Sequence, residues 1–320
     1  MGIVSTYVLY PSALFLFGTP KKQLFLSILE KNLPTVEVIF AAYNEETVIE
    51  EKIRSVLASN YPSHKLILRV GSDNSTDGTN AILEKLKQEF PQRIHIELFK
   101  YRQGKSAILN QLAAQSRADY LLPTDANIIF SNQTVKELVK GVNSFKAGAC
   151  GGQIIYPKVV DKGIAQQEST YLNFENKLKY CESKLWGLTM GLEGGCYIIQ
   201  RRLFPRIPIN FFMEDFFVTL SILEQGYRVV FNPQAVVTED VSIVPQEEFK
   251  RKVRISIGNF QNLNHFRHLI LKRFWAVGFS FLMHKILRWL TPFFLLIIWA
   301  SLMVLMFYSV LYQIMALAFM

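Results

Sequence analysis

One short segment near the middle of the chain strongly constrains the fold. Residues 120–124 are mostly apolar, and they are followed by Asp125 and Asn127 before apolar residues resume at Ile128. This pattern predicts a buried strand that presents two oxygen-bearing side chains at its carboxyl end, where ligands bind in open α/β sheets. Oxygen donors at this spacing suit a divalent cation that holds a diphosphate, because Mg²⁺ combines one or two protein carboxylates with substrate phosphates. The alternative is an Asx-type turn that caps the next helix.

Three further strands are expected upstream of this segment. The segments 36–42, 66–70 and 94–98, of which the first two are mostly apolar, alternate with segments whose apolar residues recur at helical spacing. A cluster of turn-forming residues at 71–78 ends the second run. Strands that alternate with helices at this rhythm predict an α/β domain with a mostly parallel sheet. The N-terminal part of the chain is therefore expected to be a nucleotide-binding α/β half.

The second half of the chain changes in character. A long amphipathic helix is predicted over 165–185, and another helix opens near Glu214 and ends at Gly226, a typical C-terminal stop. The strands expected in this half are 149–155, 194–200, 228–231 and 235–237.

The two ends of the chain are too apolar for an ordinary soluble domain. Half of all residues are hydrophobic, and no charged residue occurs from Thr291 to Met320, a length that can cross a bilayer. We therefore predict a transmembrane helix over 291–315. Residues 272–290 mix aromatic and basic side chains, which favours an amphipathic helix in the membrane interface. Residues 1–20 are expected to be membrane-associated as a partial span, an interfacial segment or a signal-like region, although no basic region precedes them as in a secretory signal.

The chain has a formal net charge of +9, and its basic residues gather beside the apolar ends. Nine Lys and Arg and no acidic residue lie between Lys250 and Arg288, and Lys21 and Lys22 follow the N-terminal apolar segment. Basic residues that flank spans mark the cytoplasmic side and favour anionic headgroups. We therefore expect an inner or plasma membrane location with the main domain on the cytoplasmic side. Nucleic-acid binding is disfavoured because no aromatic and basic platform accompanies the charge.

The three cysteines, Cys150, Cys181 and Cys196, show no paired spacing. Neither a disulfide framework nor a metal site is expected from them. We predict that they are buried, reduced thiols in a cytosolic compartment.

Five short motifs occur in one order along the chain. They are VIFAAYNE at 38–45, SDNSTDGT at 72–79, Gly104-Lys105, TDAN at 124–127 and Glu214-Asp215. Together they resemble the inverting glycosyltransferases of family 2, over roughly residues 33–264. The flanking apolar segments resemble the membrane-associated polysaccharide-synthase branch, the relatives of cellulose and hyaluronan synthases. The resemblance implies a catalytic domain over 33–264 with the glycosyltransferase A fold (a nucleotide-diphospho-sugar transferase) and flanking membrane helices.

The resemblance assigns three side chains to the nucleotide sugar. Asp73 is expected to contact the base, since a carboxylate accepts the imide N–H of uracil more strongly than an amide carbonyl does. Glu45 is expected near the nucleotide, and it also suits the start of the next helix, where acidic residues are favourable. Lys105 is expected to reach the donor phosphates or ribose, unless it is only a solvated residue at a helix start. Asp77 is expected to cap the helix that follows it.

Asp125 and Asn127 stand where the family has Asp-x-Asp. The resemblance makes them ligands of a divalent cation, Mn²⁺ or Mg²⁺, that holds the donor diphosphate. Because an amide is neutral, we expect Asp125 to dominate cation binding, with looser affinity and a tendency to favour Mn²⁺ over Mg²⁺.

Glu214 and Asp215 match the base motif of the family. Transfer with inversion needs a carboxylate opposite the diphosphate that takes the proton of the acceptor hydroxyl. The resemblance assigns this role to Asp215, and Glu214 is expected to orient it or the acceptor. Phenylalanines on both sides should desolvate the carboxylate and raise its pKa. The alternative is that Asp215 only caps a helix.

The Gln-x-x-Arg-Trp element of these relatives is not present verbatim. Residues 251–258 occupy its place, and Arg254 is the candidate that neutralises the leaving diphosphate. The alternative is a basic helix lying on anionic lipid. No tryptophan follows, which argues against long processive synthesis. Gly194 and Gly195 are expected to form part of the donor floor, because missing side chains allow close approach, with Glu193 near the sugar hydroxyls.

These features predict a membrane-bound inverting glycosyltransferase. The donor is expected to be a UDP-sugar, with GDP-mannose as the alternative, and the acceptor a glycan or a lipid-linked sugar at the membrane surface. A catalytically weak nucleotide-sugar sensor or scaffold is the competing hypothesis, which Asn127 and the absent tryptophan favour. A nucleotidyltransferase is disfavoured because residues 43–46 lack the glycine-rich, basic loop that a triphosphate needs.

Overall fold

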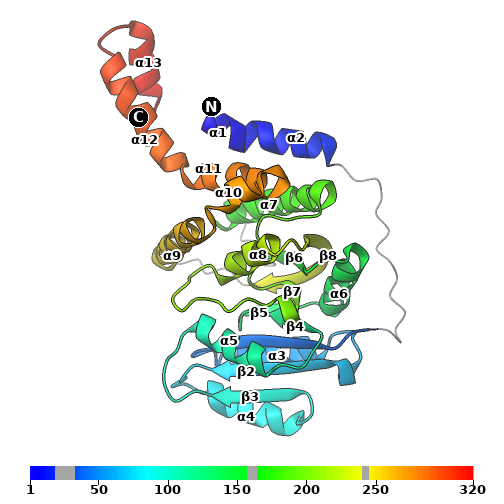
Figure 1. Cartoon of the computed structure of the whole chain (residues 1–320). Helices are drawn as coiled ribbons and strands as arrows, with labels where there is room; N and C mark the ends of the chain where they lie inside the picture. Colours follow the sequence, from blue (N-terminus) through cyan, green and yellow to red (C-terminus); the bar gives the residue numbers. More distant parts are fainter. Residues whose placement is uncertain (19–32, 157–163, 240–244, 320) are drawn as a thin grey trace.

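The computed structural model describes residues 1–18, 33–156, 164–239 and 245–319. Within these ranges one eight-stranded sheet runs through the body of the molecule in the order β3-β2-β1-β4-β7-β6-β8-β5 (Figure 1). The strands are β1 (Val36–Ala42), β2 (Leu66–Ser72), β3 (Ile94–Leu98), β4 (Tyr120–Pro123), β5 (Ile128–Phe130), β6 (Ala149–Ile155), β7 (Tyr197–Gln200) and β8 (Val229–Glu239).

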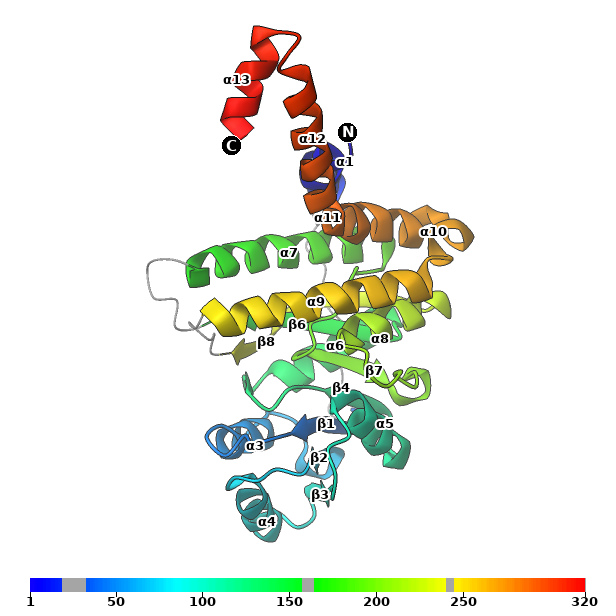
Figure 2. The ribbon, with the colours of Figure 1, turned by 90° about the vertical axis from the view of Figure 1, so that its left-hand side faces the viewer.

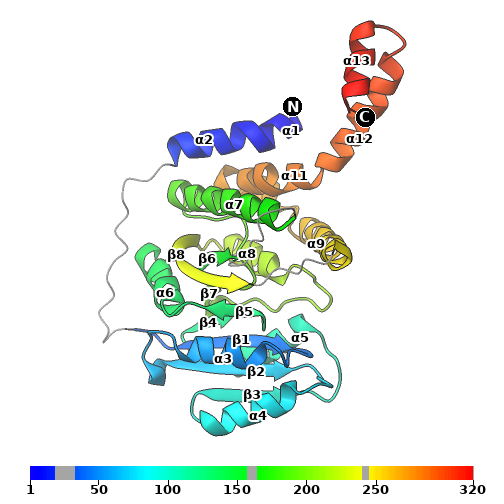
Figure 3. The same ribbon diagram turned by 180° about the vertical axis from the view of Figure 1, so that it is seen from behind.

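Helices cover both faces of this sheet, and further helices gather at the end where the termini lie (Figures 1 and 3). The helical segments are α1 (Gly2–Val4), η1 (Ser5–Leu9), α2 (Tyr10–Phe17), α3 (Ile49–Leu57), η3 (Ser63–Lys65), α4 (Thr79–Glu89), α5 (Lys105–Gln115), α6 (Thr134–Phe145), α7 (Ile164–Trp186), η4 (Arg201–Leu203), α8 (Glu214–Glu224), α9 (Pro245–Phe266), α10 (Leu269–Lys272), η5 (Phe274–Gly278), η6 (Phe281–Ile286), α11 (Leu287–Trp289), α12 (Thr291–Leu305) and α13 (Val310–Phe319).

The N-terminal half of the sheet is parallel, as the alternation of strands and helices predicts. β1 lies between β2 and β4 and pairs in parallel with both, and β2 pairs in parallel with β3. Parallel strands need a crossover connection, and α3, α4 and α5 supply it. The carboxyl ends of β1, β2 and β4 therefore meet at one edge, where the motifs of the sequence follow them.

The C-terminal half adds antiparallel pairs to a sheet that is still mostly parallel, as predicted, with four parallel and three antiparallel pairings among the described strands. β7 pairs antiparallel with β4 and β6, β5 pairs antiparallel with β8, and β6 pairs in parallel with β8. An apolar run gives no strand direction, because direction is set by the path of the connecting segments. The two short strands predicted at 228–231 and 235–237 are one strand, β8, which follows β6 across an irregularity between Gly151 and Gln153.

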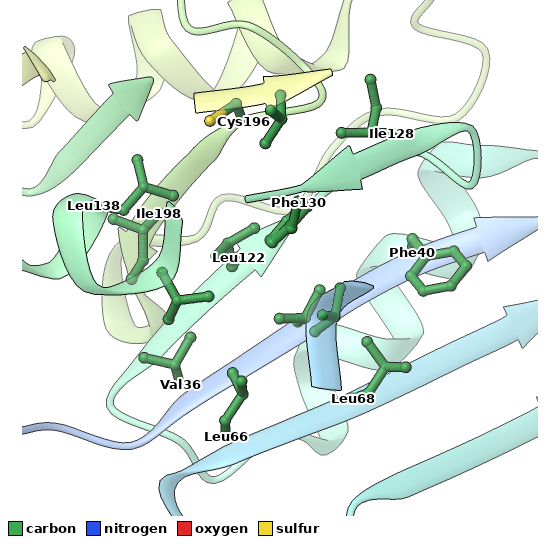
Figure 4. Packing of buried hydrophobic residues seen from close by; sticks show 14 of the residues in the cluster. Val36, Phe40, Leu66, Leu68, Leu122, Ile128, Phe130, Leu138, Cys196 and Ile198 are labelled. Atoms are coloured by element: carbon green, nitrogen blue, oxygen red, sulfur yellow. The ribbon is translucent and has the colours of Figure 1, made fainter. Parts of the chain in front are cut away.

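Successive residues of β1 point to opposite faces of the sheet and belong to separate cores. Val36, Val38 and Phe40 pack in a cluster with side chains of α3, α4 and α6, part of which Figure 4 shows, whereas Ile39 faces α5 and α8. All four side chains are fully buried. A strand buried on both faces reads as a continuous apolar run, which is why β1 is recognisable in the sequence.

A buried lysine of α3 fixes the loop between β4 and β5. Lys52 is fully buried, and its Nζ donates to Thr124 Oγ1 (2.9 Å) and to the carbonyl of Ile128 (2.6 Å). Thr124 Oγ1 in turn donates to the carbonyl of Gly195 (2.9 Å). These contacts hold both ends of the loop that carries Asp125, and they tie it to the loop before β7. Burial lowers the pKa of the Lys52 amine well below its ordinary value.

The N-terminal helical segment lies against α7 and the helices that follow α10 (Figures 1 and 2). Tyr10 and Leu14 are buried in a small cluster with Leu178 and Cys181 of α7. Trp186 packs near the rings of Tyr10 and Phe279. Packing against these two rings therefore accounts for the position of this tryptophan.

A buried polar network joins the N-terminal helix, α7 and the helices that follow α10. Glu182 of α7 is fully buried; its Oε1 accepts from the Tyr10 hydroxyl (2.6 Å) and lies 2.6 Å from Nδ1 of His284. Its Oε2 accepts from the backbone N–H of Met190 (2.9 Å). His284 Nε2 lies 3.0 Å from Glu175, which also binds Lys285 and Arg288. One carboxylate thus connects the N-terminal helix, the C-terminal helices and the loop after α7.

The C-terminal apolar stretch is divided into shorter helices. The helix predicted over 272–290 is interrupted near Trp275 and Ala276, and Gly278 packs closely on the backbone of the preceding helix α10. The helix predicted over 291–315 ends at Leu305, and α13 turns back beside α12 (Figure 3). Ser309 directly precedes α13, and its hydroxyl accepts from the N–H of Leu311 as a helix cap does.

Among the described residues, no single helix has both the length and the apolar composition to cross a bilayer. The pair Phe274–Trp289 and Thr291–Leu305, bent by 55°, meets that length and composition jointly. The three cysteines are buried and free, as predicted.

We predict that Glu182→Ala lowers the free energy of unfolding by about 3–5 kcal/mol, because it leaves a buried histidine and a buried tyrosine hydroxyl without their partner. Urea unfolding followed by tryptophan fluorescence measures this, since Trp186 lies beside the network. Glu89→Ala, which removes an exposed ion pair with Arg54, is the control and should change stability little. Equal effects of the two variants would contradict the assigned role of Glu182.

We also predict that Lys52→Met removes a pH dependence of stability. The folded protein holds the Lys52 amine with a lowered pKa, so the unfolded chain binds more protons and stability rises with pH up to the ordinary lysine pKa. Between the lowered pKa of Lys52 and the ordinary lysine pKa, the free energy of unfolding of the wild type should therefore rise by up to about 1.4 kcal/mol per pH unit relative to that of the variant. Unfolding at several alkaline pH values measures the difference, with Lys87→Met on the exposed face of α4 as the control. Parallel pH curves for wild type and Lys52→Met would disprove the assignment.

Candidate active site

The candidate site lies where β4 ends and the loop before β7 passes beside it. Asp125 follows β4 by two residues, in the loop that Lys52 and Thr124 hold. Gly194 lies next to it: a Cβ placed on Gly194 would be 3.8 Å from Asp125 Oδ2 and 3.3 Å from Asp215 Oδ2. The carboxylates of Asp125 and Asp215 therefore border the same space at Gly194, although Asp125 follows strand β4 and Asp215 belongs to helix α8. Because Gly194 has no side chain, both carboxylates can lie this close to its backbone.

Lys105 connects the two sides of this space. It begins α5 directly after Gly104, whose φ of +83° is a backbone conformation that favours glycine. Its ammonium contacts the carboxylates of Asp125 and Glu214. Although burial opposes the charge, these two carboxylates hold the pKa of Lys105 well above its ordinary value. Lys105 is thus part of the site and not a solvated residue at a helix start.

Glu214 and Asp215 open helix α8. Glu214 is buried, and Asp215 is half-buried with its Oδ1 accepting from the N–H of Phe216 (2.7 Å). Burial, together with the charges of Glu214 and Glu193, raises the pKa of Asp215 to about 7, and Lys105 offsets this only in part. The raised pKa agrees with the expectation from the phenylalanines, and the neighbouring carboxylates add to it.

Glu193 is held in place by α7. Its carboxylate contacts the ammonium of Lys179, which is buried. The same loop is fixed at Met190 by Glu182. Helix α7 therefore positions the segment that carries Glu193 and Gly194, and through Glu193 it influences the charge on Asp215.

Asn127 is exposed and has a partner that sequence patterns do not reveal. Its Nδ2 donates to Glu239 Oε1 (3.0 Å) at the end of β8. Burial and the charge of Asp125 raise the pKa of Glu239. Glu239 lies far from any motif in the sequence, and only the pairing of β5 with β8, which sets Glu239 opposite Ile128, brings it here.

Glu45 faces the same region from the end of β1. Burial raises the pKa of Glu45, and the charges of Asp125 and Asp77 raise it further. Its carbonyl also accepts from the N–H of Val48 and Ile49, so the backbone of Glu45 opens the next helix as the sequence suggests.

Asp73 and Asp77 act on neighbouring backbone. The Asp73 carboxylate is buried and accepts from the N–H groups of Gln103 (2.7 Å) and Gly104 (3.0 Å), and it contacts Arg102. It thereby fixes the loop that leads into Lys105, a role in addition to the predicted contact with the base. Asp77 accepts from the N–H of Thr79 (3.0 Å) at the start of α4, as expected of a helix cap.

Arg254 lies on α9 and is exposed. One turn further along the same face, Gly258 packs against Met213, and Asn262 donates to the carbonyl of Met213 (3.2 Å). Met213 precedes Glu214, so α9 adjoins the start of α8 (Figure 2). The structure sets Arg254 on the helix that borders the site, without a described contact to the site carboxylates.

The oxygen atoms of Asp125 and Asn127 suit a cation whose remaining ligands come from the phosphates of the substrate. Within the described residues, no three His, Cys, Asp or Glu side chains gather closely enough to hold a metal ion by themselves. A dication that takes one carboxylate and one amide oxygen from the protein needs further ligands from a diphosphate, which is how Mg²⁺ is usually bound. Asp125 would supply the carboxylate oxygen and Asn127 the amide oxygen of such a site.

Two family profiles match the chain. Residues 37–207 match the family described as Glycosyl transferase family 2, and residues 125–320 match Glycosyl transferase family group 2. Together these ranges contain all the site residues described above.

Curated relatives agree with these matches. The chain is 26% identical over 242 residues to "Probable glycosyltransferase YdaM" of Bacillus subtilis, covering 72% of the chain and 56% of that protein. It is 25% identical over 251 residues to poly-beta-1,6-N-acetyl-D-glucosamine synthase of Staphylococcus aureus, covering 76% of the chain and 59% of that protein. The chain thus spans less than two thirds of the length of either relative.

A solved structure has the same fold. The mannosyltransferase PcManGT from Pyrobaculum calidifontis, in complex with GDP-Man and Mn²⁺, superposes with a TM-score of 0.76 at 21% identity, covering 99% of this chain and 87% of that one. The likeness shows the fold, which is the glycosyltransferase A arrangement expected from the sequence. By its matched profile, the chain belongs to glycosyltransferase family 2.

Proposed function

We propose that the protein is a membrane-bound inverting glycosyltransferase that transfers a sugar from a nucleotide-diphosphate donor in a metal-assisted single displacement. The observation that carries this proposal is that the carboxylates of Asp125 and Asp215 both lie beside Gly194. A single displacement needs a leaving group on one side of the anomeric carbon and a base on the other. Family membership supports the same reaction.

Each side chain has a defined part in this mechanism. Asp125 and Asn127 would hold a divalent cation, which when bound supplies positive charge that stabilises the departing diphosphate. Lys105 adds a cationic group on the same side. Asp215 takes the proton of the acceptor hydroxyl while the acceptor oxygen forms its bond to the anomeric carbon. The bond from that carbon to the phosphate oxygen breaks, and its electron pair leaves with the nucleoside diphosphate.

A UDP-sugar is the donor that we propose, with GDP-mannose as the alternative to be tested beside it. Asp73, at the end of β2, supports a base-binding role by its position, and its carboxylate is anchored by two backbone N–H groups. The mannosyltransferase of similar fold was crystallised with GDP-Man and Mn²⁺, which supports a cation-dependent nucleotide-sugar site in general.

Attachment to the membrane is proposed from the surface at the end where the termini lie. Helices α12 and α13 expose many large apolar side chains and project from the body (Figures 1 and 3). Leu271 at the end of α10 is 84% exposed and Trp275 just after α10 is 88% exposed, beside Lys272 and Arg273. This mixture of apolar and basic groups suits a cytoplasmic membrane surface with anionic lipid. The acceptor would be a glycan or a lipid-linked sugar at that surface.

We predict that Asp215→Asn reduces transfer by at least about 10²-fold, because an amide cannot take the acceptor proton. Nucleotide binding should persist, measured as Mn²⁺-dependent thermal stabilisation by UDP and, in parallel, by GDP. Glu224→Gln on the exposed end of the same helix is the control. Transfer at the wild-type rate by Asp215→Asn would remove the proposed base. Nucleotide binding without transfer by the wild-type protein would favour the sensor or scaffold hypothesis.

We further predict that kcat/KM rises with pH and levels off near pH 7. The pKa of Asp215 is raised to about 7, and only the ionised carboxylate accepts the proton. Below that value the rate should fall about tenfold per pH unit, since kcat/KM reports groups of the free enzyme. A pH profile with saturating Mn²⁺ measures this, and a flat profile between about pH 5 and 7 would contradict the assignment.

A further inference from the structure

The side chain of Glu239 is the partner of Asn127 in this structure. Glu239 ends β8, and its pairing with Ile128 of β5 sets it beside the loop that carries Asp125 and Asn127. Asn127 Nδ2 donates to Glu239 Oε1 (3.0 Å). Asn127 itself is exposed, whereas Glu239 is only partly so, which leaves the amide open on its other side.

This hydrogen bond decides which atom of the amide is available to a cation. An ionised carboxylate accepts hydrogen bonds but does not donate them, so Asn127 must turn its NH₂ group toward Glu239. The carbonyl oxygen then faces the opposite way. Only that oxygen can bind a dication, and a flipped amide would present hydrogens instead. Glu239 therefore fixes the amide in the orientation that a ligand requires.

Glu239 also contributes the negative charge that an asparagine lacks. With Asn127 neutral, Asp125 is the one charged candidate ligand, and Glu239 lies close enough to Asp125 for the two charges to interact. An acid in place of Asn127 would stand next to Glu239, and two adjacent carboxylates cannot both ionise easily. Asn127 and Glu239 thus act together: Asn127 supplies the oxygen that would contact the cation, and Glu239, hydrogen-bonded behind it, supplies the negative charge.

We propose that Glu239 is a positioning residue of the cation site, which orients the amide of Asn127 toward the cation and supplies the second negative charge there. This inference rests on the cation role assigned under the proposed function. Partners that orient metal ligands are typically worth 10- to 100-fold in metal affinity, about 1.4–2.7 kcal/mol.

The test measures Mn²⁺ binding to the full purified chain by the electron paramagnetic resonance of free Mn²⁺, with UDP and with GDP. Glu239→Gln keeps the size of the side chain but loses its charge and its strict acceptor character, so we expect about 10- to 100-fold weaker binding. Glu224→Gln, an exposed exchange of the same type, should bind as wild type does. Asp125→Asn should abolish binding and so show that the signal comes from this site.

Exchanging the pair provides the sharper test. Asn127→Asp alone should not tighten Mn²⁺ binding, because the new acid meets Glu239 at hydrogen-bond distance. Combining Asn127→Asp with Glu239→Gln should restore binding to within a few-fold of wild type. Far-UV circular dichroism and thermal unfolding check that each variant is folded. Should Glu239→Gln fold poorly, Asn127→Asp alone carries the test.

The possible failures are distinguishable. Undiminished Mn²⁺ affinity in Glu239→Gln, or tighter binding by Asn127→Asp with Glu239 in place, would overturn the inference and leave the proposed function intact. Wild-type protein that binds no Mn²⁺ with either nucleotide, or Asp125→Asn that binds as well as wild type, would overturn the cation site and the inference together.

Discussion

The site is built on the crowding of like charges around the space at Gly194. Asp125, Glu214 and Asp215 meet there, and in water their repulsion would keep them apart. The fold holds them together because Lys105 contacts two of the three, while the apolar surroundings of α8 leave Asp215 with a raised pKa. The repulsion between these carboxylates also favours the proposed chemistry. It favours binding of a dication at Asp125, and it raises the affinity of Asp215 for a proton.

Two buried side chains hold the loops that bear this charge, and neither belongs to a motif. Lys52 reaches from α3 to both ends of the loop after β4, and the Thr124 hydroxyl that it binds donates in turn to the carbonyl of Gly195. Glu182 holds Met190 from the opposite side, and its other oxygen binds Tyr10 and His284. The loop beside Gly194 is therefore joined through one carboxylate to the helices proposed to meet the membrane. The same contacts of Glu182 therefore fix the position of those helices and the position of the loop in the site.

Much of the N-terminal half could be predicted from the sequence, because its central strand β1 is buried on both faces and mostly apolar, and because its strands alternate regularly with helices. β1, β3 and β6 begin and end at the predicted residues. The antiparallel pairs of the other half could not be predicted, since direction and register depend on partners distant in the chain. The continuous helices expected over 272–290 and 291–315 are broken for a related reason: composition shows that a segment is apolar, but tight packing at Gly278 and the cap at Ser309 decide where it turns.

By itself, the sequence determined which side chains carry the chemistry, because acids, an amide and a lysine must follow particular strands to serve a nucleotide-diphosphate donor. Asp125, Lys105, Glu214 and Asp215 could all be named from their motifs. Only the tertiary structure decided what stands opposite each of them. Glu239 reaches Asn127 because β5 pairs with β8, and Gly194 lies beside Asp125 because β7 runs antiparallel to β4. Such contacts arise from the closing of long loops, which no local pattern of residues records.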